Sequence, residues 1–285
     1  MSDPASSFRL TLAPGASVEL PVLYEDDALM AVDKPGGLMV APDTFDPGKP
    51  NLMSGVRRAL DTGAAWVQER GLTMLSNVHR LDADTSGVLL LAKTHEALSA
   101  LSGQFNDRTV GKSYVALVEG EPAEDAFEVE LKIGPHPSRP WVQIEQRHGG
   151  KQTLTKFRVL ERFRLRPMRG QRESLPFLSC SLIGCEPETG RTHQIRVHLR
   201  HAGHPILCDK VYGEGERSAL FLSQLKPGYK SHEAAAEHPL LGRLALHAER
   251  LTVAHPVTGA RVEFIAPLPK DFTVALKYLR KFAAA

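Results

Sequence analysis

Residues 79–93 read HRLDADTSGVLLLAK, and they place a charged group at the start of a buried strand. Asp82 lies between Arg80 and the Thr-Ser-Gly tripeptide at 85–87, directly before an apolar run long enough for such a strand. Thr, Ser and Gly are common turn residues, so the sequence predicts a turn at 85–87 and a strand after it. Because an unpaired buried charge is costly, this position predicts a carboxylate held by a specific environment.

Residues 188–204, ETGRTHQIRVHLRHAGH, form a second group of polar residues within an apolar pattern. If residues 192–202 are helical, Arg196 shares a face with apolar side chains such as Leu199. A buried arginine needs an anion, since an uncompensated buried charge is strongly unfavourable. We expect Asp82 to be this anion, and a neighbouring guanidinium would keep Asp82 ionised at neutral pH.

An ionised and oriented carboxylate can act as a nucleophile or as a base, so the sequence indicates a catalytic role for Asp82. Two structural interpretations stay open beside this one. Asp82 could only brace its own loop, as aspartates in turns often do. Asp82 and Arg196 could also form a purely structural ion pair, because such pairs shift pKa values as catalytic sites do.

The remaining pattern predicts an α+β fold. Alternating apolar and polar residues bounded by Gly and Pro are typical of strands, and apolar residues three or four apart are typical of helices. We expect strands near residues 18–23, 29–32, 112–119, 128–133, 177–183, 244–253 and 260–265, and helices at 52–70, with a break at 61–63, at 95–108 and at 272–282. Because no βαβ spacing repeats, we expect a mainly antiparallel mixed sheet flanked by helices.

With 285 residues, 42% hydrophobic and 24% charged, the chain has the composition of a globular protein and not of a disordered or fibrous one. Residues 1–16 are small, polar and interrupted by Pro and Gly, which predicts a flexible N-terminal arm. Residues 17–285 show no linker and are expected to form a single domain. No apolar run approaches the roughly 20 residues of a membrane-spanning helix, and the N-terminus lacks secretory-signal features, so we expect a cytoplasmic protein with no membrane partner.

Cysteine and histidine spacing argues against a metal centre. The three cysteines are too few and too irregularly spaced for a disulfide framework or a zinc site, so reduced and mostly buried thiols are expected. His198, His201 and His204 are three residues apart, which turns about 300° per step on a helix and spreads them over its surface. Solvated or phosphate-facing histidines are therefore expected, and a metal-dependent hydrolase stays open as an alternative.

The net charge of +2 neither requires nor excludes a nucleic-acid partner, so the clustering of basic residues has to decide. Two segments are rich in basic residues: Arg191, Arg196, Arg200 and Lys210 in one, and Arg162, Arg164, Arg166, Arg169 and Arg172 in the other. Alternation in the second segment places its first three arginines on one face of a strand. This face could follow a phosphate backbone or could be an ordinary solvated strand face, and both interpretations stay open.

Four long motifs are HRLDADTSGVLLLAK at 79–93, KSYVALVEG at 112–120, ETGRTHQIRVHLRHAGHPI at 188–206 and LHAERLTVAHPVTG at 246–259. Together with DDALMAVDKPGGLMVAP and DKVYG, and in this order, they resemble the RluA-type RNA pseudouridine synthases. The resemblance begins near residue 22 and runs to the end of the chain. It implies the pseudouridine synthase fold, with a central active-site cleft in a single catalytic domain.

The same resemblance implies an isomerase that acts on uridine in ribosomal or transfer RNA. Such an enzyme breaks the N-glycosidic bond, turns the freed uracil and rejoins it to the ribose through carbon. The resemblance implies no cofactor and no metal. A monomer is the default expectation, and a noncatalytic RNA-binding or ribosome-assembly factor on the same fold stays open as an alternative.

Position by position, the resemblance also implies roles for named residues. Asp82 matches the essential aspartate, and Arg196 matches the arginine that pairs with it, with Ile195 beside it in the pocket. Tyr114 matches the tyrosine that stacks on the target base, and Arg80 matches the arginine associated with nucleotide extrusion. Further RNA contacts are expected from His79, Thr85, Arg191, His193 and Arg200. Asp82 would act as a nucleophile at C1′ or as a base on a glycal route, and both routes stay open.

The chain departs from the family pattern in three respects. The segment before residue 22 is too short for the RNA-binding S4 domain that often precedes this catalytic domain, so RNA selection is expected to come from the catalytic domain or from a partner. Cys208 stands where related stretches usually have glycine. Ala41 stands where they often have histidine.

Overall fold

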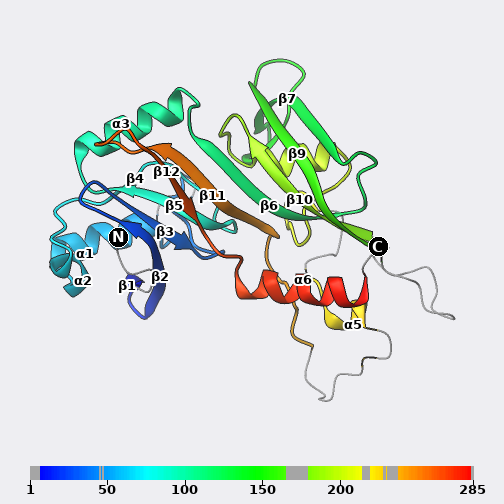
Figure 1. Cartoon of the computed structure of the whole chain (residues 1–285), viewed down its shortest axis with the longest axis horizontal. Helices are drawn as coiled ribbons and strands as arrows, with labels where there is room; N and C mark the ends of the chain where they lie inside the picture. Colours follow the sequence, from blue (N-terminus) through cyan, green and yellow to red (C-terminus); the bar gives the residue numbers. More distant parts are fainter. Residues whose placement is uncertain are drawn as a thin grey trace. The chain divides into compact units, whose positions relative to one another are not determined.

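The computed structural model describes residues 7–44, 46, 48–164, 179–213, 219–226, 229 and 237–283. The chain divides into two compact units, and each is described by itself with the element labels of Figure 1. Unit 1 contains Met1–Ser113 and Ala248–Pro267, and unit 2 contains Tyr114–His247 and Leu268–Ala285. The sequence predicted one domain because no linker marks this division, which falls inside two strands, β6 (Gly111–Glu119) and β11 (Leu246–Ala254).

Unit 1 is built on a sheet with the strand order β1-β2-β3-β5-β11, to which β4 adds beside β5 and β12 beside β11. Its further strands are β1 (Ser7–Ala13), β2 (Ala16–Glu25), β3 (Leu29–Lys34), β4 (Ser76–Asn77), β5 (Ser86–Ala92) and β12 (Arg261–Ile265). The pairs β1–β2, β2–β3, β3–β5 and β11–β12 are antiparallel. All residues of β5 are buried, which confirms the buried strand expected after Asp82.

Residues 7–13, which the sequence pattern assigned to a flexible arm, form β1. Phe8 and Leu10 alternate with exposed residues and are buried. The ring of Phe8 stacks on that of Trp66, with 4.3 Å between the ring centroids. Burying these apolar side chains against unit 1 stabilises the strand despite its polar, Gly-containing surroundings.

Helices α1 (Leu52–Thr62), α2 (Ala65–Glu69) and α3 (His95–Asn106) belong to unit 1. Asn51 caps α1 with its side chain, and Gly63 ends it in the left-handed conformation (φ 61°), which glycine adopts at little cost. The break predicted at 61–63 therefore separates α1 from α2.

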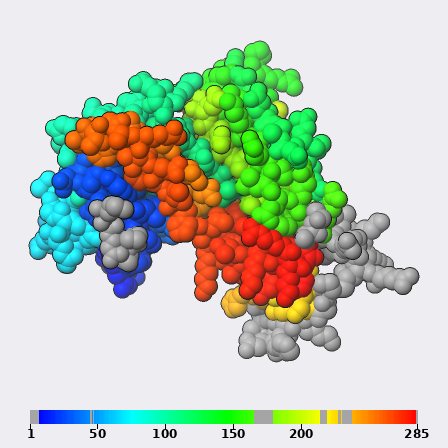
Figure 2. Space-filling view, in the orientation of Figure 1, coloured from blue at the N-terminus to red at the C-terminus, as the bar shows by residue number. Residues whose placement is uncertain are grey.

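In Figure 2 the orange surface of β11 and β12 lies beside the blue surface of the N-terminal strands, and β12 contacts β2.

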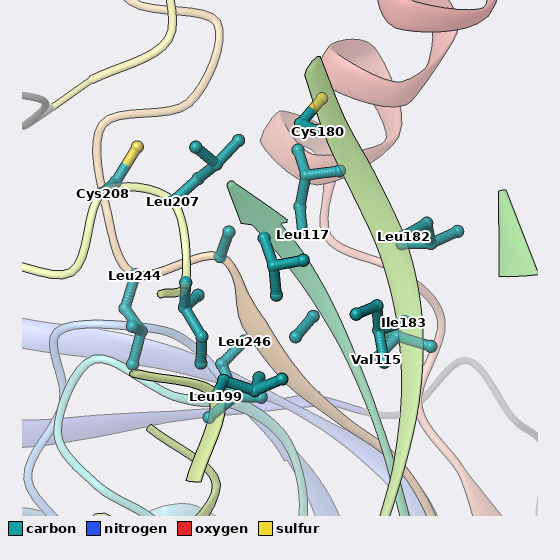
Figure 3. Packing of buried hydrophobic residues seen from close by; sticks show 14 of the residues in the cluster. Val115, Leu117, Cys180, Leu182, Ile183, Leu199, Leu207, Cys208, Leu244 and Leu246 are labelled. Atoms are coloured by element: carbon teal, nitrogen blue, oxygen red, sulfur yellow. The ribbon is translucent and has the colours of Figure 1, made fainter. Parts of the chain in front are cut away.

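Unit 2 is built on an antiparallel sheet with the order β6-β10-β9-β7-β8. Its further elements are β7 (Ala126–His136), β8 (Arg139–Glu145), β9 (Lys151–Arg164), β10 (Ser179–Pro187), α4 (Gln194–His201), α5 (Leu222–Leu225) and α6 (Lys270–Phe282). Figure 3 shows part of its core, with apolar side chains from β6, β10 and α4. The alternation of buried and exposed residues along β7 explains why the sequence pattern located it.

The α+β class with a mainly antiparallel sheet is confirmed. Two helices are shorter than predicted. α3 ends at Asn106 and not at residue 108. α4 begins at Gln194 and not at residue 192, because His193 adopts a left-handed conformation (φ 57°) that a helix cannot include. Residues 165–178, which include Arg166, Arg169 and Arg172, lie outside the described residues. Within the described chain, none of the helices has the length and apolar character needed to cross a membrane.

Candidate active site

Asp82 lies in the loop between β4 and β5 of unit 1, where the backbone forms a tight turn. The amide of Thr85 donates a hydrogen bond to the carbonyl of Asp82 (3.1 Å). The turn therefore spans residues 82–85, and the predicted turn at 85–87 is wrong because Ser86 already belongs to β5. Asp82 is half-buried, so its carboxylate stands at the margin of the unit's interior.

Lys34, at the end of β3, ties this loop to the sheet. Its side chain is fully buried, and its Nζ donates to the carbonyls of Pro35 (2.9 Å), Leu38 (2.8 Å) and Ala83 (2.9 Å). The amide of Gly37 also donates to the Ala83 carbonyl (2.9 Å). A buried ammonium group is tolerated only where its donors are satisfied, and these carbonyls satisfy them. Because Ala83 is the neighbour of the candidate carboxylate, Lys34 restrains the backbone that carries it.

The sequence analysis did not identify Lys34 as a site residue. A signal was available, because this lysine stands between a buried apolar strand and the Pro-Gly-Gly break at 35–37. A lysine at the end of a strand is most often solvated, however, and sequence alone does not show that three carbonyls converge on it.

Gly87 explains why a glycine follows the Asp82 turn. Its φ is +117°, a conformation that side-chain-bearing residues rarely adopt. A Cβ at this position would lie 2.2 Å from the carbonyl oxygen of Ala248 in β11. The close approach of two backbones therefore requires glycine here, immediately after the loop of the candidate carboxylate.

His79 has an internal structural role in unit 1. Its Nε2 accepts a hydrogen bond from the amide of Leu90 (3.1 Å), and its ring stacks on Phe105 with 4.9 Å between the centroids. Burial, together with the positive charge of Lys112, lowers the pKa of His79 to about 4. The imidazole is therefore neutral at physiological pH. These contacts align the start of the loop, and the RNA contact expected of His79 stays a prediction.

The other two predicted site residues of unit 1 differ in accessibility. Arg80 is exposed, as a residue that touches RNA must be. Thr85 has only 2% of its surface exposed, and within the described part of the chain its Oγ1 has no hydrogen-bond partner. An unsatisfied buried hydroxyl costs free energy, so this oxygen is a candidate to accept a partner that arrives with the ligand.

Arg196, in α4 of unit 2, is buried as predicted, with 5% of its surface exposed. Its Nε and Nη2 donate to the two carboxylate oxygens of Asp209, both at 2.8 Å. Burial alone would raise the pKa of Asp209, but the hydrogen bonds and charge of Arg196, with backbone amides, hold that pKa below its usual value. Asp209 is thus an anion that justifies the burial of Arg196, and the sequence analysis assigned that role to Asp82 alone.

Tyr212 packs against this ion pair. The guanidinium carbon of Arg196 lies 4.9 Å from the centroid of its ring. The Tyr212 hydroxyl lies 2.8 Å from Nδ1 of His193, and Arg200 donates from Nη1 to the Tyr212 carbonyl (3.1 Å). Three predicted site residues therefore meet at one tyrosine that the sequence analysis did not single out: Arg196, predicted as catalytic, and His193 and Arg200, predicted to contact RNA.

The loop before α4 is held by Gln194. Its Oε1 accepts from the Thr189 hydroxyl (2.6 Å) and the Arg191 amide (3.1 Å), and its Nε2 donates to the Leu154 carbonyl (3.0 Å). Arg191 is exposed at the tip of this loop. Ile195 is buried, at 6% exposure, as expected of a pocket residue.

Tyr114 lies on β6 of unit 2, opposite Cys185 of β10, and it is half-buried. A half-buried ring is compatible with packing and with stacking on a base, so its predicted role in stacking stays a prediction.

All three cysteines are buried and free, which confirms the expectation of reduced thiols.

His198 is fully buried, so the prediction of a solvated or phosphate-facing residue is wrong for it. The hydroxyl of Thr153 donates to the Leu131 carbonyl (2.6 Å) and lies 2.8 Å from Nε2 of His198. Since a hydroxyl has one hydrogen, His198 must donate from Nε2. Burial, with the charge of His201, lowers the pKa of His198 to about 4, so the imidazole is neutral at physiological pH. Among the described residues no group of His, Cys, Asp and Glu could hold a metal ion.

The basic face of β9 is occupied by acidic partners. Arg162 pairs with Asp125 (2.7 Å), and Arg164 pairs with Glu121 (2.6 Å). Because exposed ion pairs of this kind contribute little free energy, they do not decide between an ordinary strand face and a track for a phosphate backbone, and both interpretations stay predictions. The expectation of three arginines in a row lies partly outside the described residues.

The predicted site residues thus form two groups. Unit 1 carries His79, Arg80, Asp82 and Thr85 on one loop, and unit 2 carries Tyr114, Arg191, His193, Ile195, Arg196 and Arg200 on β6 and around α4. The first group offers a restrained carboxylate. The second offers guanidinium groups, an imidazole and an aromatic ring, which suit phosphate and base recognition.

Comparisons with known proteins agree on one family. The family model described as RNA pseudouridylate synthase matches residues 28–201. A ribosomal large subunit pseudouridine synthase D from Nitrosomonas europaea is 37% identical over 93% of this chain and 66% of its own length. One from Xanthomonas campestris pv. campestris is 36% identical over 96% of this chain and 73% of its own length. The chain therefore spans roughly two thirds of the relatives it matches.

A solved structure supports the fold. The human RNA Pseudouridylate Synthase Domain Containing 4 matches with a TM-score of 0.62 over 91% of this chain and 92% of that chain. Its sequence identity is 24%, so this likeness concerns the fold alone. The fold predicted from the sequence motifs is confirmed by this comparison.

Proposed function

Because the chain belongs to the RNA pseudouridylate synthase family, we propose that it isomerises uridine to pseudouridine in ribosomal RNA of the large subunit. The observation that carries the proposal is the family match over residues 28–201, which contains the Asp82 loop, Tyr114 and α4. The names of the relatives support ribosomal RNA as the substrate, and transfer RNA is the alternative substrate that the test below separates.

The reaction conserves atoms. The bond from C1′ of the ribose to N1 of uracil breaks, the base turns, and a bond from C1′ to C5 forms. The hydrogen on C5 leaves as a proton, and N1 takes up a proton. No water is added, so the site must keep water from the detached base.

Asp82 is the residue we assign to the ribose, as nucleophile at C1′ or as base for a glycal route. Its loop is restrained by Lys34, and such restraint lowers the entropic cost of reaching the reactive geometry. We assign Arg196 to keep Asp82 ionised, because a nearby guanidinium favours the charged form of a carboxylate.

Tyr114 and Arg80 are assigned to the extruded nucleotide. Taking a uridine out of a stack costs a few kcal/mol, and stacking on an aromatic ring returns about 1–3 kcal/mol. Tyr114 supplies this ring, and exposed Arg80 fills the vacated space while contacting phosphate. His79, Thr85, Arg191, His193 and Arg200 are assigned to further RNA contacts.

The test uses RNA transcribed with uridine tritiated at C5, since isomerisation releases this tritium into water. We expect release from a large-subunit ribosomal RNA transcript and none from a mixture of transfer RNA transcripts. Release from transfer RNA alone would reassign the substrate. Binding of the ribosomal transcript without any release would favour the noncatalytic RNA-binding factor and contradict the proposal.

We also propose that the protein works in the cytoplasm, as a monomer by default. The cytoplasm is supported by the relatives' names, which refer to the ribosomal large subunit. Light scattering after gel filtration should give a mass near 31.2 kDa. A mass of twice that value would contradict the monomer.

A further inference from the structure

Tyr212 contacts several residues of the candidate site in unit 2 through its hydroxyl, its ring and its backbone. Only 8% of its surface is exposed. Its hydroxyl accepts a hydrogen bond from the amide of Gln143 in β8 (2.9 Å) and lies 2.8 Å from Nδ1 of His193. Its amide donates to Oδ1 of Asp209 (3.1 Å). A tyrosine side chain that only filled space would not need these partners.

The contact between the Tyr212 hydroxyl and Nδ1 of His193 bears on the protonation of the imidazole. The Gln143 amide can only donate, so the phenol oxygen accepts from it, while the contact with Nδ1 can run in either direction because a phenol oxygen can accept twice. Where the hydroxyl donates to Nδ1, the imidazole is neutral and carries its hydrogen on Nε2. In both arrangements the contact fixes the orientation of the ring.

The backbone of His193 agrees with this role. Its φ of 57° is left-handed, which costs a residue with a side chain roughly 1–2 kcal/mol. His193 precedes the first residue of α4, yet its side chain does not cap the helix, whereas Asn51 and Thr94 do cap α1 and α3. Backbone strain of this kind persists where surrounding contacts impose it, and it is concentrated at functional sites.

The ring of Tyr212 packs against the guanidinium of Arg196. The guanidinium of Arg196 lies over this ring, 4.9 Å from its centroid, while Asp209 binds two of the guanidinium nitrogens. The Tyr212 ring restrains the plane of the guanidinium, and the Asp209 carboxylate restrains its rotation within that plane. Arg200 binds the Tyr212 carbonyl (3.1 Å), so it is attached to the same residue.

We propose that Tyr212 is a positioning residue that sets the tautomer and ring orientation of His193 for contact with RNA, and that it also fixes the plane of the buried Arg196 guanidinium. The inference rests on the proposed function and deepens it, because it assigns RNA recognition in unit 2 to one oriented cluster. An imidazole N–H donor in a fixed orientation suits a phosphate oxygen.

The first experiment tests the tautomer in the wild-type protein. Long-range ¹H–¹⁵N NMR of the imidazoles, with His193 assigned by comparison with His193→Gln, should show an unprotonated Nδ1 and a protonated Nε2. This measurement needs neither RNA nor turnover, so it is independent of the proposed function. The opposite tautomer would overturn the inference.

The second experiment is Tyr212→Phe, which removes the hydroxyl and keeps the ring under Arg196. With the large-subunit transcript as probe, we expect KM to rise about 5–10-fold, as for loss of one oriented hydrogen bond, and kcat to stay within about 3-fold. Tyr278→Phe removes a phenol hydroxyl from α6 in the same unit and is the control, with neither constant changed.

A double variant separates positioning from packing. If Tyr212 acts through His193, adding Tyr212→Phe to His193→Ala should change KM by less than about 2-fold, although each single variant raises it. Effects that multiply, or a Tyr212→Phe protein with unchanged KM, would overturn the inference. Wild-type protein that releases no tritium would instead refute the proposed function, while the tautomer measurement would still stand.

Discussion

Lys34 shows how a single buried charge can organise a site without touching a substrate. Its ammonium group replaces water with three carbonyl oxygens, one of them next to Asp82. The net gain from such hydrogen bonds is small, but the cost of leaving the carbonyls unpaired is large. Lys34 therefore restrains the loop of the candidate carboxylate, together with the amides of Gly37 and Thr85.

Replacing this ammonium group tests the claim. Lys34→Met keeps the approximate length of the side chain but removes the donor to the Pro35 and Leu38 carbonyls, while the Gly37 amide still donates to that of Ala83. We therefore expect the free energy of unfolding to fall by about 2–4 kcal/mol in urea titration. Lys49→Met is the control, because Lys49 is exposed in the same unit. A loss below about 1 kcal/mol for Lys34→Met would contradict the structural role.

His198 predicts a pH dependence with a definite sign. Its pKa is about 4 in the folded protein and 6.5 when unperturbed, so the unfolded chain binds a proton first as the pH falls. Its contribution to stability is complete above pH 6.5 and is lost between pH 6.5 and 4. At pH 5 the loss should be about 2 kcal/mol.

His198→Gln isolates this effect, because glutamine can donate to Thr153 and cannot be protonated. Its unfolding free energy should vary less with pH between 6.5 and 4 than that of the wild type. Parallel pH profiles for the two proteins would show that His198 is not the buried neutral group inferred here. His79, with a pKa of about 4, contributes to both profiles equally.

At the scale of the elements, the close approach of β5 to β11 depends on the glycine at position 87. Gly87→Ala would place a Cβ 2.2 Å from the Ala248 carbonyl oxygen at a φ of +117°, so β5 and β11 would have to separate. We expect destabilisation of more than about 4 kcal/mol, seen as loss of soluble protein or of the unfolding transition. Gly103→Ala, in the open interior of α3, should instead stabilise by about 0.5–1 kcal/mol. Equal stability of the two variants would contradict this account of the β5–β11 approach.

Sequence patterns located most elements because each buries one regular face. β5 and α1 were predicted from apolar runs and spacing, and both are present. The Asp82 turn and the start of α4 were placed incorrectly, because both depend on backbone conformations that composition does not reveal. Cys208 also has a backbone conformation that the sequence did not reveal. Its φ of 61° is left-handed, which favours glycine and explains why related stretches usually have glycine at this position.

At the scale of the whole molecule, the sequence motifs predicted the family and fold, and the comparisons confirm both. Residue types at the candidate site were predicted as well, and Arg196 is buried as expected. What the sequence did not reveal is which distant groups meet. Asp209 lies only 13 residues from Arg196 along the chain, yet its pairing depends on the fold of the segment between them. Lys34 and Ala83 are 49 residues apart, and only the folded sheet brings them together.

Asp82 is the residue on which the catalytic proposal depends, and the decisive measurement is tritium release from the large-subunit transcript by Asp82→Asn and Asp84→Asn. The two aspartates belong to the same turn, and Asp84 is exposed. Loss of the reacting carboxylate should lower the rate at least about 1,000-fold, with the melting temperature unchanged, while Asp84→Asn keeps the wild-type rate within about 3-fold. An Asp82→Asn protein that releases tritium at the wild-type rate would contradict the account.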